Sequence, residues 1–326
     1  MKTFWKWTLR IFISLLLVVI LVLTVFCISE RITFFSFYKN ADIESSIPDI
    51  LSGYIPQGYC LVENNDFRLG CGYMKGDDAS RIYVMPDEEE NPYFVEMKNI
   101  DGSDYTGHTG GIAVMGDFVY VTGKTGCDVF SLDDITDGDG KAAVMFEVDT
   151  INDPAYCYIK DNVLYSGSFY REGNYETPAE HRLKTPVGDD NMAIIAAYSL
   201  DPSSGEAYSK TPDFIISTVG LAQGMTFIGE NKIALATSYG LAKSHLYVYN
   251  LAKATTDYDV FEIDGEYLPV TYLDRSCLID DIVAPPMAEQ ILYDNGRICI
   301  MNESASLKYL FGNLTSGRYV YGYKYE

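Results

Sequence analysis

The stretch QGMTFIGENKIALAT, residues 223–237, carries the pattern that predicts the fold of this chain. An apolar run at 223–228 leads into a tight polar turn, Glu230-Asn231, and a second apolar run follows at 232–237. Short apolar runs punctuated by Gly, Asn and Asp are typical of antiparallel β-strands joined by hairpin turns. The stretch therefore predicts a β-hairpin, and the surrounding sequence contains related copies of it.

Five copies of this unit follow one another along the chain, each with an apolar first strand, a polar turn, and second and third strands. First strands are expected at 57–62, 110–114, 155–159, 223–228 and 289–293, turns at 64–65, 116–117, 161–162, 230–231 and 294–295, second strands at 67–72, 118–122, 163–167, 232–237 and 297–301, and third strands at 81–85, 128–132, 193–200, 245–250 and 318–325. Counted from residues 58, 111, 156, 224 and 290, the units start 53, 45, 68 and 66 residues apart. Four short strands per unit at this spacing predict the blades of a β-propeller.

The last unit supplies only three strands, so its missing outer strand is expected from the segment before Gln57, which would close the ring. Insertions at 171–190 and 265–286 account for the two long units and are expected to form loops. We therefore predict an all-β fold, a five-bladed β-propeller over residues 47–326. A β-sandwich with a second domain is the structural alternative, and the repeat argues against it.

Residues 11–29, IFISLLLVVILVLTVFCIS, form a run of 19 residues without a charge. As a helix that rises about 1.5 Å per residue, this run is roughly 28 Å long, close to the apolar thickness of a bilayer. Lys2, Lys6 and Arg10 precede it. By the positive-inside rule these residues predict a cytoplasmic tail at 1–10, a single transmembrane helix at 11–29, a flexible juxtamembrane stalk at 30–46, and a propeller outside the cytoplasmic membrane.

Two other interpretations of the apolar run are less consistent with the sequence. A cleaved signal peptide has an apolar region of about 7–15 residues that ends in small residues, whereas this run is longer and Val25-Phe26-Cys27 offers no such cleavage site. A buried core helix would need a partner, and the sequence contains no other long helical pattern. The run therefore favours an uncleaved anchor.

The charge distribution excludes some partners. The chain carries a net charge of −22. Residues 1–31 contain four basic residues and one acidic residue, so the remaining chain carries −25. A body this acidic is repelled by nucleic acid and by anionic lipid, and neither is expected as its main partner.

The cysteines leave the redox state open. Six cysteines lie beyond Cys27, an even number that permits three disulfides in 15 connectivities. No C-x-x-C spacing occurs, which argues against a zinc site or a thioredoxin-like motif.

Short motifs at the blade openings carry a family resemblance. The segments His108-Thr109-Gly110-Gly111-Ile112, Gln223-Gly224-Met225-Thr226-Phe227 and Pro285-Pro286-Met287-Ala288-Glu289 resemble bacterial surface propellers of the YncE-like type, within the quinoprotein-like propeller superfamily. The resemblance covers about residues 55–326 and implies a fold rather than a function. No Trp occurs after residue 7, so Trp-Asp repeats and the Trp-docked blades of alcohol-oxidising quinoproteins are disfavoured, and no cofactor is expected.

Propeller geometry brings the openings of the first strands and the loops between second and third strands to one face of the ring. Convergent polar groups with aromatic neighbours form the default binding-site hypothesis. The predicted ligand-binding residues at this channel mouth are Gln57, His108, Lys124, Tyr170, Gln223, Tyr239, Glu289 and Glu303. Tyr73, Lys75 and Phe169 lie in the same loops.

Two of these residues have competing interpretations. His108 and Glu289 are expected to work as a base–acid pair, or else as a turn residue and a carboxylate that caps a strand end. Gln57 and Gln223 are expected to line the channel as hydrogen-bonding groups. The mouth is expected to be acidic, because Glu289 and Glu303 outweigh Lys124, and His108 is then expected to protonate more easily than free imidazole.

No metal site is predicted. A lactonase-type propeller needs several carboxylates on its inner strands, and these openings offer one, Glu289. The acidic stretch 133–140 departs from an EF-hand loop at Ile135 and Val144 and fits a solvated turn better. No nucleophile elbow, H-E-x-x-H motif or phosphate-binding loop is present.

These features favour a membrane-tethered, non-enzymatic module that binds a protein, peptide or glycan outside the cytoplasm. The first alternative is a metal-dependent hydrolase or lactonase acting at the channel mouth. The second alternative is a purely structural cell-surface protein.

The anchor generates the first testable prediction. Intact-mass measurement or N-terminal sequencing of the mature protein should find the apolar run still attached, because its length and flanking charges suit a membrane span. A new N-terminus between Cys27 and Ala41 would contradict the anchor and favour secretion.

Overall fold

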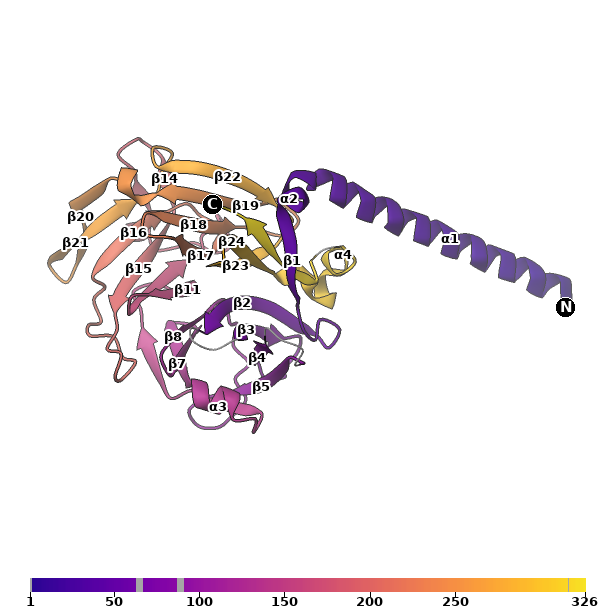
Figure 1. Ribbon diagram of the computed structural model, residues 1–326, viewed down its shortest axis with the longest axis horizontal. Coiled ribbons are helices and arrows are strands. Elements are labelled where there is room, and N and C mark those ends of the chain that lie inside the picture. The colour runs from indigo at the N-terminus through magenta and orange to yellow at the C-terminus, as the bar shows by residue number, and fades with distance from the viewer. Residues whose placement is uncertain (1, 63–66, 87–90, 316) are drawn as a thin grey trace.

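The computed structural model describes residues 2–62, 67–86, 91–315 and 317–326, and in it five antiparallel sheets surround a common centre (Figure 1). Each sheet contributes one innermost strand. These strands are β2 (Tyr54–Val62), β6 (Ile112–Met115), β11 (Pro154–Lys160), β17 (Ala222–Ile228) and β23 (Ala288–Asp294). Each contacts the next along the chain, and β23 contacts β2. The chain is therefore a closed five-bladed β-propeller, as the repeat predicts.

The other strands of each blade follow outward in an antiparallel order. The second strands are β3 (Phe67–Met74), β7 (Phe118–Thr122), β12 (Val163–Ser168), β18 (Lys232–Thr237) and β24 (Arg297–Asn302). The third strands are β4 (Arg81–Pro86), β8 (Gly126–Ser131), β15 (Ala193–Ser199), β19 (Ser244–Asn250) and β25 (Tyr319–Lys324). The outer strands are β5 (Tyr93–Lys98), β10 (Phe146–Asp149), β16 (Phe214–Thr218), β22 (Leu278–Ala284) and β1 (Ala41–Ser46). The expected turn at 64–65 lies outside the described residues.

Further elements lie between or outside the four strands of the blades, and two of them add a parallel strand to a sheet. β9 (Lys141–Ala143) pairs with β5, and β21 (Glu266–Tyr272) pairs with β16. The remaining short elements are α3 (Leu132–Thr136), η1 (Ala179–His181), β13 (Leu183–Lys184), β14 (Asp190–Asn191), η2 (Leu251–Lys253), β20 (Thr256–Ile263), η3 (Glu303–Ala305), η4 (Leu307–Tyr309) and α4 (Leu310–Asn313).

The expectation that residues 265–286 form a loop is wrong. This segment contains β21 and β22, and β21 forms a hairpin with β20. Asp264 and Gly265 form the hairpin turn, with φ of 51° and 87°. Positive φ at both central residues is the signature of a type I′ turn, for which Asp-Gly is a preferred pair. The other predicted insertion, 171–190, contains η1, β13 and only short regular structure besides.

The ring is closed by an N-terminal strand, as predicted. β1 pairs with β25 from Ala41 opposite Tyr323 to Ser46 opposite Tyr319. Ion pairs from Arg297 to Glu44 (2.6 Å) and from Lys324 to Asp42 (2.9 Å) reinforce this pairing.

The structured region begins earlier than the expected boundary at residue 47. α1 (Lys2–Thr33) runs on through the first part of the expected stalk, and α2 (Phe35–Asn40) leads directly into β1. The sequence of β1, ADIESS, hides this strand because it lacks apolar alternation. Charged residues suit an exposed outer edge, where they discourage pairing with another chain.

One side chain, that of Gln290, occupies the centre of the ring. Its Oε1 accepts hydrogen bonds from the backbone N–H groups of Tyr59 (3.0 Å) and Ile112 (2.8 Å). Its Nε2 donates to the backbone carbonyls of Ile112 (2.7 Å) and Cys157 (3.1 Å). Gln290 lies on the innermost strand of the fifth blade, so one buried amide joins that blade to the first three.

Glycines let the inner strands approach closely around this centre. A Cβ atom at Gly111 would lie 2.7 Å from the backbone nitrogen of Cys157, and one at Gly224 would lie 2.6 Å from the Cα of Gln290. Such distances leave no space for a side chain. The six cysteines of the ring are buried thiols in this structure, and none forms a disulfide.

Replacing Gln290 should destabilise the whole ring. Gln290→Leu leaves buried N–H and C=O groups of three blades without their partner, at an expected cost of about 3–5 kcal/mol in unfolding free energy. Urea unfolding of the purified protein measures this loss. Gln223→Ala, in the equivalent part of the fourth blade, is the control and should cost less than about 1 kcal/mol. Equal losses in the two variants would contradict a central role for Gln290.

Candidate functional site

Bulges at the start of the innermost strands create the channel mouth. The pairing register shifts between Pro56 and Gly58 in β2, between Ala222 and Gly224 in β17, and after Ala288 in β23. A bulge releases a residue from the strand ladder and redirects its side chain. The released residues include Gln57, Gln223 and Glu289, three members of the predicted site. The corresponding residue in β11 is Ala155.

Two glutamates from the fifth blade form the core of this mouth. Glu289 is buried and accepts a hydrogen bond from Gln223 Nε2 at 3.4 Å. Glu303, at the start of η3, accepts hydrogen bonds from the hydroxyls of Tyr73 and Tyr309, both at 3.2 Å. Gln57 Nε2 donates to the carbonyl of Pro56 at 2.9 Å, and Gln57 is close enough to Glu303 to lower its pKa. We refer to Glu289 and Glu303 as the carboxyl pair.

The surroundings of the carboxyl pair affect the pKa values of its two members differently. Burial raises the pKa of Glu289 well above its ordinary value, and the nearby Glu303 raises it further. Burial also raises the pKa of Glu303, but Lys308, the hydrogen bonds from Tyr73 and Tyr309, and the nearby Gln57 oppose this effect. Desolvation disfavours a charge, whereas a cation and hydrogen-bond donors favour a carboxylate. Of the two groups, Glu289 therefore favours its protonated form more strongly than Glu303 does.

Lys308 is a cation in this cluster. Its Nζ donates to the Tyr73 hydroxyl at 2.9 Å and lies 5.4 and 5.0 Å from the centres of the Tyr73 and Tyr309 rings. The predicted cation, Lys124, is exposed on the turn between β7 and β8. The mouth therefore contains Lys308 close to the carboxyl pair, and its expected acidic character stays a prediction.

His108 belongs to the same cluster, and its ring centre lies 4.6 Å from that of Tyr73. The side chain is accessible to solvent, yet the protein packed around it lowers its pKa through desolvation, and the charge of Lys308 lowers it further. The expectation that His108 protonates easily is therefore wrong. A neutral imidazole beside Lys308 avoids placing two cations together.

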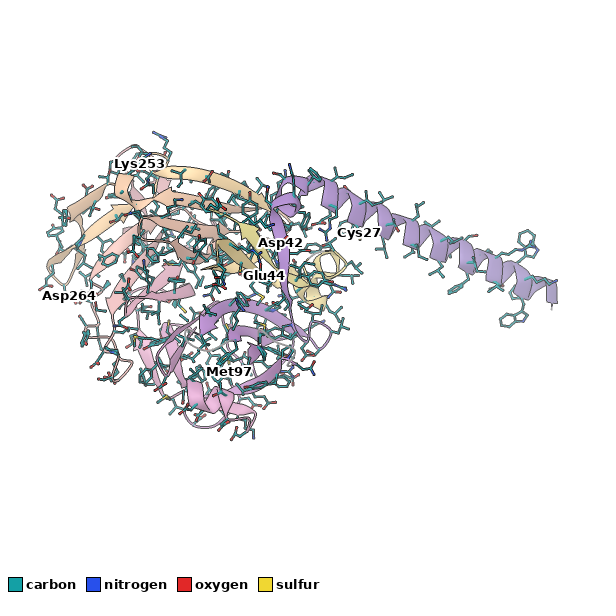
Figure 2. All side chains as sticks on the ribbon, viewed as in Figure 1. Cys27, Asp42, Glu44, Met97, Lys253 and Asp264 are labelled. Atoms are coloured by element: carbon teal, nitrogen blue, oxygen red, sulfur yellow. The ribbon has the colours of Figure 1, made fainter. Side chains whose placement is uncertain are left out.

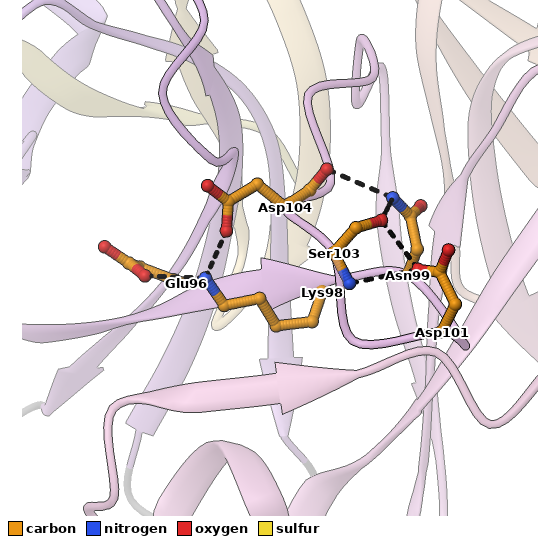
Figure 3. Close-up of polar contacts among 6 residues, drawn as sticks. All are labelled: Glu96, Lys98, Asn99, Asp101, Ser103 and Asp104. Atoms are coloured by element: carbon orange, nitrogen blue, oxygen red, sulfur yellow. Dashed lines mark hydrogen bonds and ion pairs between the residues drawn. The ribbon is translucent and has the colours of Figure 1, made fainter.

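The segment between β5 and β6 leads to His108, and Figure 3 shows the polar contacts at its start. At its start Lys98 donates to Glu96 (2.8 Å) and Asp104 (2.5 Å), and Asn99 Nδ2 donates to Ser103 Oγ (2.9 Å). Nearer to His108, Ser80 Oγ donates to the carbonyl of Gly107 at 2.8 Å. These local contacts fix the segment that leads to the imidazole.

A half-buried ring, Phe169, and two exposed rings, Tyr175 and Tyr239, lie beside the mouth. Phe169 stacks on Tyr239 with ring centres 6.5 Å apart and meets Tyr175 edge-on at 5.6 Å. The guanidinium of Arg171 lies 4.0 Å from the centre of the Tyr239 ring. Tyr175 is close enough to Tyr309 to raise its pKa, which connects this group to the carboxyl pair. We call Phe169, Tyr175 and Tyr239 the aromatic shelf.

Not every predicted site residue joins these groups. Tyr170 packs against Arg182, whose guanidinium lies 5.0 Å from its ring, and its carbonyl accepts from the N–H of Leu221. Sequence reasoning missed Lys308, Tyr309 and Tyr175. Their loops share no repeat between blades, and only the nearness of Lys308 and Tyr309 to Glu303 in sequence hinted at their position.

In the part of the chain that the structure describes, no three His, Cys, Asp or Glu side chains are grouped to hold a metal ion. In the acidic stretch 133–140, residues 133–136 belong to the one-turn helix α3, which Ser131 caps. Asp137 and Asp139 then accept backbone N–H groups two residues ahead, at 2.9 Å each. Such contacts are those of a solvated turn.

No protein-family model matches the sequence, and a search of characterised proteins finds no match. Similar solved structures include the nidogen/laminin complex, with 11% identity, coverage of 77% of this chain and 73% of the other, and a TM-score of 0.40. They also include PQQ-bound aldose sugar dehydrogenase from Streptomyces coelicolor (12%, 80% and 78%, 0.42) and Myxococcus xanthus glutaminyl cyclase (9%, 80% and 91%, 0.42).

With TM-scores of 0.40 to 0.42 these likenesses carry no argument, and the propeller assignment rests on the five sheets described above. At such low identities the likeness concerns the fold alone. The finer resemblance to YncE-like proteins has no support from the sequence comparisons.

The raised pKa of Glu289 predicts a pH effect on stability. Below about pH 4 both the folded and unfolded chains hold this proton, so it has no effect on stability. Above that pH the unfolded chain releases the proton while the folded chain keeps it, so the raised pKa lowers stability as pH increases. Glu289→Gln, which cannot titrate, should therefore gain stability relative to wild type between pH 5 and pH 8.

Thermal melting of both proteins at the two pH values measures this effect. Glu230→Gln, at an exposed turn, serves as the control and should follow wild type. Parallel pH profiles for wild type and Glu289→Gln would contradict the raised pKa of Glu289.

Proposed function

We propose that this protein is a membrane-anchored propeller that binds carbohydrate at its channel mouth, outside the cytoplasm. The observation that carries the proposal is the pairing of a hydrogen-bonding mouth with the aromatic shelf. Glu289, Gln223 and Tyr309 offer both donors and acceptors, which suit the hydroxyl groups of a sugar. Aromatic faces stack on the apolar faces of sugar rings.

The charge of the mouth supports a glycan over a charged peptide. Lys308 lies close to Glu303, while burial raises the pKa of Glu289 and lowers that of His108, which favours the neutral form of each. A highly charged ligand would have to break the hydrogen-bonded group around Glu303. An uncharged, polyhydroxylated ligand exchanges hydrogen bonds with it at no electrostatic cost.

The proposed location rests on α1. One helix, from Phe4 to Thr33, is long and apolar enough to cross a membrane. The basic residues Lys2, Lys6 and Arg10 favour an N-terminus inside the cell and a propeller outside it. The proposal therefore places the protein in the cytoplasmic membrane as a single-pass protein.

A second candidate function is favoured by the carboxyl pair itself. A protonated carboxylic acid close to a carboxylate is the arrangement that glycoside-cleaving enzymes use as acid and base or nucleophile. In such a reaction Glu289 would donate its proton to the leaving oxygen. Glu303 would act as base or nucleophile on the opposite side of the sugar ring. This activity requires that the bound sugar reach between the two groups.

Binding can be tested on a glycan array with the full chain in nanodiscs, followed by calorimetry on the ligands found. Tyr239→Ala removes a ring of the shelf and should weaken binding about tenfold or more, equivalent to about 1.4 kcal/mol. Tyr258→Ala removes a more exposed tyrosine on β20, 69% exposed against 39% for Tyr239, and should leave affinity unchanged. Equal affinities for wild type and Tyr239→Ala, or binding to peptides alone, would contradict the proposal.

The same material distinguishes binding from cleavage. Release of reducing ends from a bound glycan, abolished by Glu289→Gln while binding persists, would support the enzymatic candidate. Binding without release supports the binding module.

A further inference from the structure

A patch of exposed leucines lies on the same face of the ring as the channel mouth. Leu307 and Leu310 follow Glu303 in the loop between β24 and β25 and are 44% and 57% exposed. Leu314 comes one turn after Leu310, on the same side. Leu241, in the loop between β18 and β19 of the neighbouring blade, is 71% exposed. We call Leu241, Leu307, Leu310 and Leu314 the leucine patch.

Hydrogen bonds hold the backbone beneath the leucine patch, and its side chains are exposed. Asn313 Nδ2 donates to the carbonyl of Ala305 at 2.7 Å. The guanidinium of Arg318 donates to the carbonyl of Asn313 from Nε (3.1 Å) and Nη2 (2.8 Å). These polar contacts face the ring and leave the apolar side chains facing away from it.

The patch lies next to the membrane-spanning helix. Cys27 Sγ donates to the carbonyl of Leu314 at 3.4 Å, and Figure 2 labels Cys27 where α1 passes α4. Cys27 precedes the end of the charge-free run, Ser29, by two residues, or about 3 Å along a helix. The patch is therefore at the depth where the apolar run ends.

A groove of about 400 Å³ separates α1 from the ring at this position. Its apolar lining includes Phe26, Phe34, Leu241, Pro285 and Phe311. The helix wall of the groove runs from Phe26 to Phe34, so it begins within the charge-free run and continues past its end at Ser29. With α1 in a bilayer, the groove is therefore continuous with the edge of the apolar layer. Glu30 and Lys243 also line the groove, and Lys243 suits the phosphate of a zwitterionic lipid headgroup.

From this continuity we propose that the leucine patch rests in the outer leaflet of the membrane that α1 crosses, with lipid acyl chains filling the groove. The inference rests on the anchoring described under the proposed function. Apolar residues drive the contact, because the acidic body of the protein is repelled by anionic lipid. Zwitterionic phosphatidylcholine is therefore the appropriate bilayer.

The absence of tryptophan beyond residue 7 provides a direct test. The full chain is reconstituted in phosphatidylcholine vesicles with Trp5 and Trp7 replaced by Phe and a single reporter introduced as Leu310→Trp. Lipids brominated on their acyl chains should quench this reporter at least twofold and its emission should be shifted to the blue. Leu307→Trp provides a second position should the first variant fold poorly.

Two further proteins separate the outcomes. Tyr258→Trp, on β20 at the opposite side of the ring from α1 in Figure 1, should remain unquenched. The native protein, with Trp5 and Trp7, reports insertion of the anchor. Quenching in the native protein without quenching at residues 307 and 310 would overturn the inference while leaving the anchor intact. No quenching in any of the proteins would overturn both.

Discussion

The four hydrogen bonds of the Gln290 side chain are the constraint on which the remaining architecture depends. They hold β23 at a fixed distance from the inner strands of three other blades. Glu289 directly precedes Gln290 in the same bulge, so the position of the carboxyl pair follows from the position of this amide. Two neighbouring residues thus determine the centre of the ring and the chemistry of its mouth. Gln290 forms hydrogen bonds with backbone groups, and burial raises the pKa of Glu289.

The mouth shows why the charge of a whole chain is a poor guide to a site within it. The body carries −25, yet at the mouth Lys308 lies close to the carboxyl pair and burial raises the pKa of Glu289, which favours its neutral form. Burial and pairing act over a few ångströms, whereas charges elsewhere on the surface are screened by solvent and salt. Neutral, hydrogen-bonding groups can therefore lie at the centre of a strongly acidic protein.

The sequence predicts the ring because each blade repeats the pattern seen at 223–237. It also predicts where Gln57, Gln223 and Glu289 lie, because these residues stand at the start of first strands. The sequence analysis did not predict the position of β1, because its polar residues show no apolar alternation. It also did not predict β21 and β22, because the turn signal at Asp264-Gly265 was missed. Lys308 and Tyr309 lie in a loop without a repeat. The pKa of His108 depends on burial and on Lys308, and a pattern of strands predicts neither.

The pairing of β1 with β25 also dictates when the protein can finish folding. Ala41 is synthesised long before its partner Tyr323, which lies in the fifth blade. Contacts between residues so far apart in sequence form slowly, because the loop between them must close first. Until then β25 presents a bare strand edge on the fifth blade. Ring closure therefore has to wait for β25, even though β1 is available much earlier.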